Sequence, residues 1–293
     1  MEFLNFEIKD AENLNRFLRV EGEFSCENSF VNLWAWQSLY NNKYAYLSEG
    51  IVVLSGVGES FFSLPFGGDL KRGVEEIIEG NGGKLPIFWV QESARFDDFL
   101  KHFGHLYDVK ESAVDADYIY SREKLSTLAG KKYHSKRNHI SAFSRKFDWH
   151  YEPIGEENVE EILVCTDKWY SENLERVTEE MECEKDVIKE MIINRELLGV
   201  LGGAIFVDNI AVAYCLGSPL NNSVFDIHIE KGLSDFQGAY AVINREFAFR
   251  ELDGYEYINR EDDLGIEGLR RAKLSYNPEF LLKKFLLLPK EGL

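Results

Sequence analysis

Three titratable residues alternate along one short segment of the chain, Asp226, His228 and Glu230. Residues two apart in a β-strand point to the same face, so this spacing predicts one polar face, with apolar residues on the other. Such a row is costly to bury unless its face lines a wet cleft. Neighbouring carboxylates raise the pKa of each other and of an imidazole, which suits a general base that deprotonates an amine. We therefore take the three as candidate catalytic residues; an open face of ordinary exposed polar residues is the alternative.

A second concentration of functional groups is the segment from residue 122 to residue 146. Its only acid is Glu123, although the whole chain has 33 basic and 51 acidic residues and a formal net charge of -18. A basic segment in so acidic a chain indicates a binding strip for phosphates, either of a nucleotide cofactor or of RNA. A solvated linker helix whose cations pair with the acidic bulk is the alternative. The candidate substrate-binding residues here are Lys131, Lys132, Lys136 and Arg137.

Two later stretches add cationic side chains. The polar loop 259–265 follows a predicted strand, where ligands gather in such sheets, and it makes Arg260 a candidate for substrate binding. The predicted helix after it carries Arg270 and Lys273. Lys273 lies at the end of that helix, where a buried ammonium would neutralise a substrate phosphate or carboxylate, and we count it among the catalytic residues. Helix capping and surface solubility are the alternative for this basic group.

The predicted elements that hold these residues occur in the same order twice. Each pass reads strand, two helices, three strands, helix, strand, helix, strand; the first runs from a strand at 5–8 to one at 116–120, and the second from 148–151 to an apolar run at 280–288. This order is that of the Gcn5-related N-acetyltransferase (GNAT) fold, a mixed sheet with helices on its faces. We therefore predict an α/β (α+β, mixed-sheet) protein of two tandem GNAT-like domains, 1–130 and 131–293, each with its own sheet.

Composition excludes several classes of protein. Of the 293 residues, 45% are hydrophobic and 29% are charged, so the chain is neither disordered nor fibrous. The net charge argues against a nucleic-acid coat protein or a polybasic membrane binder. The four cysteines form no C-x-x-C pair, and the pairs His102/His105 and His134/His139 have no nearby carboxylate, so we predict no metal site. The absence of a signal sequence and of a long apolar span predicts a cytoplasmic location.

The loop before the predicted helix 238–252 bears on the choice of donor. Acetyl-CoA enzymes of the GNAT class carry Q/R-x-x-G-x-G/A at this point, so that backbone N–H groups hold the pyrophosphate. This chain keeps only Gly232 and Gly238, with Asp235 in the path of the anion. A carboxylate there favours a helix cap over a pyrophosphate site, which argues against CoA.

Three stretches carry a further signal: residues 125–143 with Lys132, Lys136, Arg137 and Asn138, residues 238–248, and residues 268–276 with Lys273. They resemble, in turn, the basic K/R-x-N-x-I helix, the second-domain helix and the G-L-x-x-F-K-x-x-F element of the phosphatidylglycerol lysyltransferase C-terminal-domain family. This family is related to the Fem peptidoglycan-bridge aminoacyltransferases, which are tandem GNAT folds. The resemblance implies that Lys273 handles the anionic substrate, and it adds Asn138 and Gly238 to the candidate substrate-binding residues.

The chain departs from that family in two respects. Lipid-modifying members carry D-L-M-R where this chain has Asp226-Ile227-His228-Ile229, and they have a large membrane-spanning half that is not seen here. Both departures argue against phosphatidylglycerol itself as the acceptor.

The leading hypothesis is a transferase that moves an aminoacyl group from aminoacyl-tRNA to an amine or hydroxyl of a lipid head group, a peptide or a small molecule, with no permanently bound cofactor. Asp226, His228 or Glu230 would take the proton, Lys273 and Arg270 would steady the anionic partner, and residues 131–137 would hold the phosphates of the tRNA. Two alternatives are open: an N-acyltransferase that uses acyl-CoA as co-substrate, and a non-catalytic binding module on a GNAT scaffold. The sequence leaves the oligomeric state undetermined.

Overall fold

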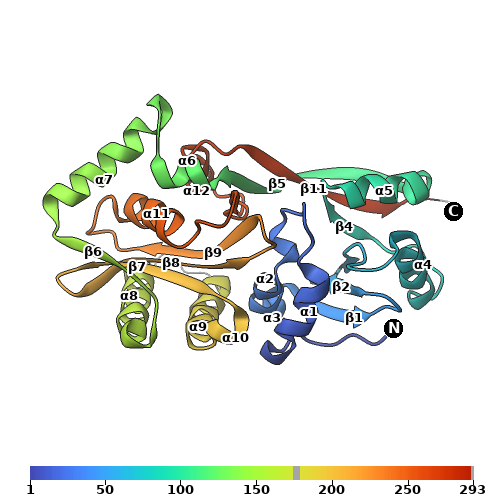
Figure 1. Ribbon diagram of the computed structural model, residues 1–293. Helices are drawn as coiled ribbons and strands as arrows, with labels where there is room; N and C mark the ends of the chain where they lie inside the picture. The colour runs from blue at the N-terminus through green and yellow to red at the C-terminus, as the bar shows by residue number, and fades with distance from the viewer. Residues whose placement is uncertain (174–178, 292–293) are drawn as a thin grey trace.

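A single mixed sheet runs through the whole molecule. The computed structural model describes residues 1–173 and 179–291, apart from the side chains of residues 179–182. Within these residues the strand order is β1-β2-β3-β4-β11-β5-β10-β9-β8-β7-β6 (Figure 1). The strands are β1 (Lys43–Tyr46), β2 (Ile51–Ser55), β3 (Phe61–Phe62), β4 (Phe88–Gln91), β5 (Tyr107–Ser121), β6 (Trp149–Pro153), β7 (Leu201–Val207), β8 (Ile210–Pro219), β9 (Val224–Gly232), β10 (Tyr257–Asn259) and β11 (Phe280–Pro289).

Helices cover both faces of this sheet. The α-helices are α1 (Ala11–Leu18), α2 (Phe30–Ala35), α3 (Gln37–Tyr40), α4 (Leu70–Gly80), α5 (Ala94–Phe103), α6 (Arg122–Thr127), α7 (His134–Lys146), α8 (Val159–Glu172), α9 (Glu179–Ile193), α10 (Arg195–Leu198), α11 (Ala239–Arg250) and α12 (Glu267–Leu274). Short 3-10 turns include η1 (Ile8–Asp10), η2 (Cys26–Asn28) and η4 (Lys131–Tyr133).

The predicted order of elements is confirmed in the second half, which runs from β6 to β11 with the short helix α10 as the one addition. The first half lacks its first predicted strand. Leu4 makes only an isolated bridge to Tyr44. The amide of the Gln37 side chain takes the backbone bonds of Phe6, accepting from its N–H at 3.1 Å and donating to its carbonyl at 3.0 Å. A side chain therefore replaces the neighbouring strand at residues 5–8.

Each half repeats the feature that marks the GNAT sheet, a pair of parallel strands flanked by antiparallel ones. In the first half β3 runs parallel to β4, and in the second half β9 runs parallel to β10. The strands on either side of these pairs are antiparallel. The prediction of two GNAT-like halves is confirmed at this level.

The prediction of a separate sheet for each half is wrong. β5 is 15 residues long, and its last residues pair with β10 of the second half. β11, at the end of the sequence, lies between β4 and β5 and so completes the first half. β10 pairs with one edge of β5 and β11 with the other, so the strands of both halves form one continuous sheet. The division at residues 130 and 131 falls between α6 and η4 and stays a prediction.

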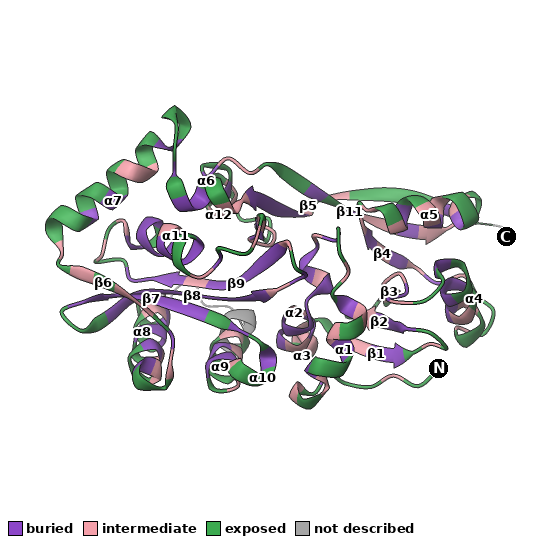
Figure 2. Cartoon of the chain, in the orientation of Figure 1, coloured by how far each residue is buried: buried purple, intermediate pink, exposed green. Residues whose placement is uncertain are grey.

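Buried side chains form three clusters around this sheet (Figure 2). One lies on the face that α6, α7 and α11 cover, and one fills the first half around α4 and α5. The third joins the halves, because residues of α1 and α2 share it with α8, α9 and β8. In Figure 1, α11 lies on one face of β7–β9, and α8–α10 lie on the other. The sheet of the second half is thus covered on both faces. We call the region where β11, β5 and β10 join the two halves the seam.

Candidate functional site

The loop that follows β10 controls the polar side chains at the seam. Its residue Glu261 has φ 54, a left-handed backbone conformation that non-glycine residues rarely adopt. The Asn259 side chain holds this turn by accepting a hydrogen bond from the Glu261 N–H at 2.6 Å. The ammonium of Lys273, from α12, donates to the backbone carbonyls of Arg260 and Asp262. Held in this way, the loop sends Arg260 and Glu261 to different polar clusters.

The first cluster is cationic and lies on the α11 side. Arg260 donates to the Glu230 carboxylate at 2.9 Å and lies over the Tyr276 ring, 4.8 Å from its centroid. The ammonium of Lys136, from α7, lies over the same ring at 3.6 Å. Burial, together with the positive charge of Arg260, lowers the pKa of Lys136 to about 8. Three predicted residues from three separate segments therefore meet here.

This cluster contains a hydrogen-bond donor that is free to bind a ligand. Nη1 of Arg260 is buried and has no hydrogen-bond partner among the residues that the structure describes. Asn244 of α11 donates at 3.4 Å to Oε2 of Glu230, the same oxygen that accepts from Arg260. A free guanidinium N–H beside an ammonium suits a carboxylate or phosphate oxygen of a ligand.

The sequence-based expectation that Asp226, His228 and Glu230 share one face is wrong. β9 contains a bulge: Ile227 pairs with Gly217 and Ile229 with Leu216, so His228 is an extra residue without a partner in the ladder. The faces exchange at this point, since Ile227 packs in the cluster under α11 and Ile229 in the cluster on the opposite face. Glu230 consequently joins the cationic cluster, while Asp226 and His228 face the seam.

The seam cluster around His228 is buried. The side chains of Asp226 and His228 are both 0% exposed, and Nδ1 of His228 lies 3.5 Å from Oδ2 of Asp226 and 3.1 Å from Oε1 of Glu261. On its other side, Nε2 of His228 lies 2.8 Å from the Ser218 hydroxyl. Burial and the negative charge of Glu261 raise the pKa of Asp226 well above its ordinary value.

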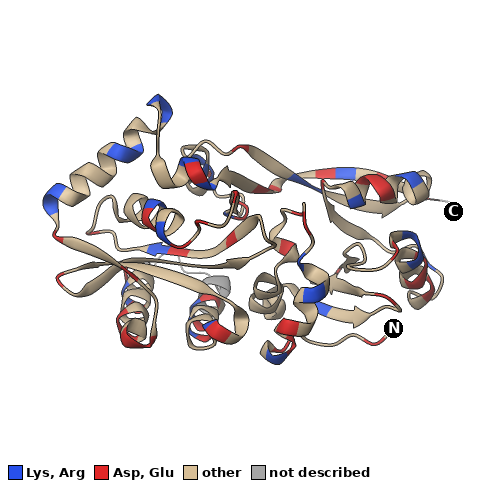
Figure 3. Cartoon of the chain, viewed as in Figure 1, with Lys and Arg blue, Asp and Glu red and all other residues tan. Residues whose placement is uncertain are grey.

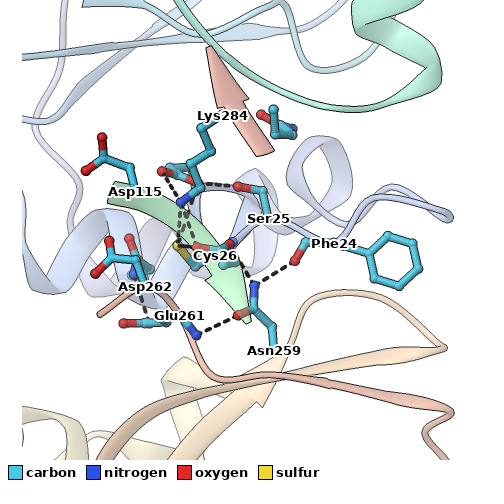
Figure 4. A network of polar contacts seen from close by, with 12 residues as sticks. Phe24, Ser25, Cys26, Asp115, Asn259, Glu261, Asp262 and Lys284 are labelled. Atoms are coloured by element: carbon cyan, nitrogen blue, oxygen red, sulfur yellow. Dashed lines mark hydrogen bonds and ion pairs between the residues drawn. The ribbon is translucent and has the colours of Figure 1, made fainter. Parts of the chain in front are cut away.

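A second acidic cluster at the seam is filled by a lysine of β11 (Figure 4). The Lys284 ammonium lies 2.7 Å from Asp117 and 2.7 Å from Glu27, and 3.5 Å from the Cys26 sulfur. Burial disfavours the charged form of this lysine, but the two carboxylates outweigh it and raise the pKa of Lys284. The ammonium thereby joins the first-half turn η2 to β5 and β11.

The remaining candidates of the second half have internal partners. Arg270 binds both carboxylate oxygens of Asp263, at 2.8 and 3.0 Å. Burial and the charge of Arg260 lower the pKa of Lys273. Gly238, just before α11, has φ +98, and a Cβ there would lie 2.9 Å from the His139 carbonyl oxygen of α7. This glycine allows α7 to contact the start of α11. The substrate roles assigned to these residues stay predictions.

Basic residues follow one another along η4 and α7 and form a row in which Lys136 and Arg137 are half-buried (Figure 3). Lys131, Lys132 and Asn138 are exposed, and Arg137 donates to the backbone carbonyls of Leu128 and Gly130. No carboxylate of the described residues lies within ion-pair distance of the row, which consists of Lys131, Lys132, Lys136, Arg137, Arg145 and Lys146. The positive charge of α7 is therefore not neutralised by the acidic bulk.

Sequence reasoning missed three residues of the seam, Glu27, Asp117 and Lys284, and it included Glu261 only as part of the polar loop 259–265. Two of them had a visible signal, because Asp117 and Lys284 are charged residues inside apolar segments, 116–120 and 280–288. A charge in such a strand needs a partner elsewhere in the fold. Glu27 had no comparable signal, because its place depends on how η2 reaches the seam.

Comparisons with known proteins were made with this geometry in hand. Residues 19–288 match the model of the family described as "Phosphatidylglycerol lysyltransferase, C-terminal". A curated relative, an uncharacterised protein of Mycoplasmoides gallisepticum, is 26% identical over 189 residues, which are 62% of this chain and 59% of that protein. The chain thus spans less than two thirds of that relative. None of the described helices combines the length and hydrophobicity needed to cross a bilayer.

Three solved structures share the fold. A conserved protein of unknown function from Bacteroides thetaiotaomicron is 34% identical, with a TM-score of 0.91 over 99% of this chain and 100% of that one. L-PGS from Bacillus licheniformis is 17% identical, with a TM-score of 0.67 over 100% and 95% of the two chains. FemX is 10% identical, with a TM-score of 0.60 over 98% and 97%.

We expect the Lys284→Met substitution to reduce the free energy of unfolding by about 3 kcal/mol at pH 7, because it leaves the buried carboxylate of Asp117 and the partly exposed one of Glu27 without their cation. The raised pKa of Lys284 means that its contribution is complete at neutral pH and is lost only as the pH rises through that value. In the variant the carboxylates gain protons as the pH falls. The difference in free energy of unfolding between the variant and the wild type should therefore become smaller toward pH 5. Urea titrations at several pH values measure this.

The neighbouring lysine provides the control. Lys283 pairs with Glu111 at 3.1 Å on the surface, both side chains being about half exposed, so Lys283→Met should cost less than about 1 kcal/mol. Equal effects of the two substitutions would contradict the assigned role of Lys284.

Proposed function

The chain belongs to the phosphatidylglycerol lysyltransferase C-terminal family, and from this premise we propose that it transfers an aminoacyl group from aminoacyl-tRNA to an amine or a hydroxyl. Family and fold together support a GNAT-like acyltransferase. The tRNA donor and the class of acceptor are the parts that we add.

One observation carries the proposal: Glu230, Arg260 and Lys136 meet at the parallel pair of β9 and β10. Ligands of open α/β sheets bind where adjacent strands separate. The cluster offers a carboxylate that can accept a proton beside two cations that can hold an anionic group. Of the three predicted bases, Glu230 is the one whose side chain is partly accessible, with 12% of it exposed against 0% for Asp226 and His228. We therefore assign the proton to Glu230.

The reaction is an acyl transfer from the ester oxygen of the donor to an oxygen or nitrogen atom of the acceptor. The acceptor amine or hydroxyl attacks the carbonyl carbon of the aminoacyl ester and loses a proton to Glu230. The ester bond to the terminal ribose of the tRNA breaks, and the ribose oxygen takes up the proton that Glu230 accepted, which returns Glu230 to its carboxylate form. Arg260 and Lys136 would stabilise the negative charge that develops during this exchange. Positioning of the two reactants supplies the rest of the rate enhancement.

The charge of α7 supports tRNA as the donor. Its lysines and arginines have no ion-pair partners among the described residues, and one of them, Lys136, lies in the cationic cluster. Such a row suits a polyanion with many phosphates. α7 also packs against the start of α11 at Gly238, where a GNAT enzyme would hold the CoA pyrophosphate, and this contact disfavours CoA.

The acceptor carries a nucleophilic amine or hydroxyl, on a lipid head group, a peptide or a small molecule. Arg270 and Lys273 lie at the loop beside the cluster, where we expect them to steady an anionic partner directly or through the loop. Because aminoacyl-tRNA is made in the cytoplasm, we expect the reaction to take place there. No permanently bound cofactor enters this scheme.

Reversal of the charge of α7 tests the donor. The double substitution Lys132→Glu and Arg145→Glu should weaken the binding of charged tRNA at least about tenfold, because it removes two phosphate contacts and adds two repelling charges. Filter binding measures the affinity, and transfer of labelled amino acid to phospholipid vesicles, peptides or small amines measures activity.

Lys101→Glu on α5 is the matched control, since it makes the same kind of charge change on an exposed helix of the other half. It should leave affinity and transfer unchanged. Loss of binding in the control as well, or no transfer from any charged tRNA to any acceptor, would contradict the proposal. Micromolar binding of acetyl-CoA in calorimetry would favour an acyl-CoA donor instead.

The pKa of Lys136 gives a second test. Because this pKa is about 8, the side chain is charged at pH 7 and loses its charge above pH 8. Affinity for the anionic donor should therefore fall as the pH rises from 7 to 9. Lys136→Arg keeps the charge throughout this range and should abolish the decline. The same decline in wild type and in Lys136→Arg would show that Lys136 does not contact the donor.

A further inference from the structure

The two acidic clusters at the seam are alike in composition but not in charge balance. Each brings three ligand-type side chains within 4.8 Å of one another: Cys26, Glu27 and Asp117 in one, Asp226, His228 and Glu261 in the other. The first holds an internal cation, the ammonium of Lys284. In the second, no Lys or Arg nitrogen of the described residues lies within 4.0 Å of either carboxylate. The second cluster therefore lacks a counterion that the first one has.

The orientation of His228 adds to this lack of positive charge in the second cluster. Its Nε2 lies 2.8 Å from the Ser218 hydroxyl, and in the tautomer that donates the Nε2 hydrogen to that oxygen, Nδ1 carries a lone pair that can bind a cation. Nδ1 then faces two carboxylates, Glu261 at 3.1 Å and Asp226 at 3.5 Å. In that tautomer three electron-pair donors face one another, and either a shared proton or a cation between them relieves their repulsion.

Asp226 supplies an independent observation. Its side chain is 0% exposed, and neither of its carboxylate oxygens has a hydrogen-bond partner within the described part of the chain. A buried carboxylate without such a partner is rare and needs an explanation. Oδ2 of this carboxylate is directed at Nδ1 of His228, toward the centre of the cluster.

We propose that Asp226, His228 and Glu261 bind one divalent cation of the zinc class. In tetrahedral coordination with bonds of about 2.0–2.1 Å, neighbouring ligand atoms lie about 3.3–3.4 Å apart. The two measured separations from Nδ1, 3.1 and 3.5 Å, lie on either side of this value. One imidazole and two carboxylates form a ligand set that zinc accepts, and the two negative charges balance the ion.

The ligands come from two elements that the loop must hold together. His228 is the bulged residue of β9 and Asp226 lies two residues before it, while Glu261 is the left-handed residue after β10. Asn32 of α2 donates to Glu261 Oε1 at 3.0 Å, and Ser218 contacts His228, so two ligands have outer partners that orient them. Glu261 is 20% exposed, which leaves a route for the ion and for a water as fourth ligand.

The test is direct binding of ZnCl2 to the full chain after treatment with a chelator. Calorimetry should give one ion per chain for the wild type. Co²⁺ in its place should give the visible absorption of a four-coordinate nitrogen and oxygen site. Asp226→Asn and Glu261→Gln, which keep the side-chain volume, should each lower the affinity more than about 100-fold. Circular dichroism checks that both variants are folded, and Glu261→Gln is the safer one because Glu261 is partly exposed.

His150→Gln is the matched control. His150 lies 3.1 Å from Glu152, as His228 does from Glu261, but this pair is exposed and has no third ligand among the residues that the structure describes. The control should bind zinc as the wild type does. No stoichiometric binding to the wild type, unchanged affinity in Asp226→Asn and Glu261→Gln, or loss of binding in His150→Gln would each overturn the proposal. The readout is independent of aminoacyl transfer, so the failure of one hypothesis does not imply the failure of the other.

Discussion

The hydrogen bonds from Lys273 to the carbonyls of Arg260 and Asp262 are the constraint on which the rest of the site depends. They fix a loop with a left-handed residue at Glu261, a conformation that the chain would not keep on its own. The loop is also bonded to β5, because Tyr118 donates to the Glu261 carbonyl and accepts from the Arg260 N–H. With this backbone held, Arg260 reaches Glu230, and Glu261 reaches His228.

The continuity of the sheet gives the same loop a second role. β5 pairs with both β10 and β11, so the loop after β10 lies next to strands that complete the first half. Asn259 links these parts directly: its amide donates to the Phe24 carbonyl at 2.7 Å and to the Asp117 carboxylate at 2.8 Å. A change in the conformation of the loop would therefore alter the positions of side chains both in the cationic cluster and in the Lys284 cluster at the seam.

Much of the fold could be predicted from the sequence, because strand and helix periodicity are local properties. The order of elements in the second half and the two GNAT-like halves followed from patterns of this kind, and so did the choice of Asp226, His228, Glu230 and Arg260 as candidates. The bulge at His228 could not be predicted, since it depends on the register with β8. The insertion of β11 between β4 and β5, which brings Lys284 to Asp117, is equally non-local. Sequence periodicity does not predict sites that form through such long-range strand pairings.

Backbone hydrogen exchange at the loop is the most direct measure of whether Lys273 holds the site. In Lys273→Met, the amides of Glu261, Leu264 and Gly265 should exchange at least about tenfold faster than in wild type, because two bonds from a charged donor are lost. Arg271→Met, at an exposed position next to it, should leave these amides unchanged. Unaltered exchange at residues 261–265 in Lys273→Met would contradict the account.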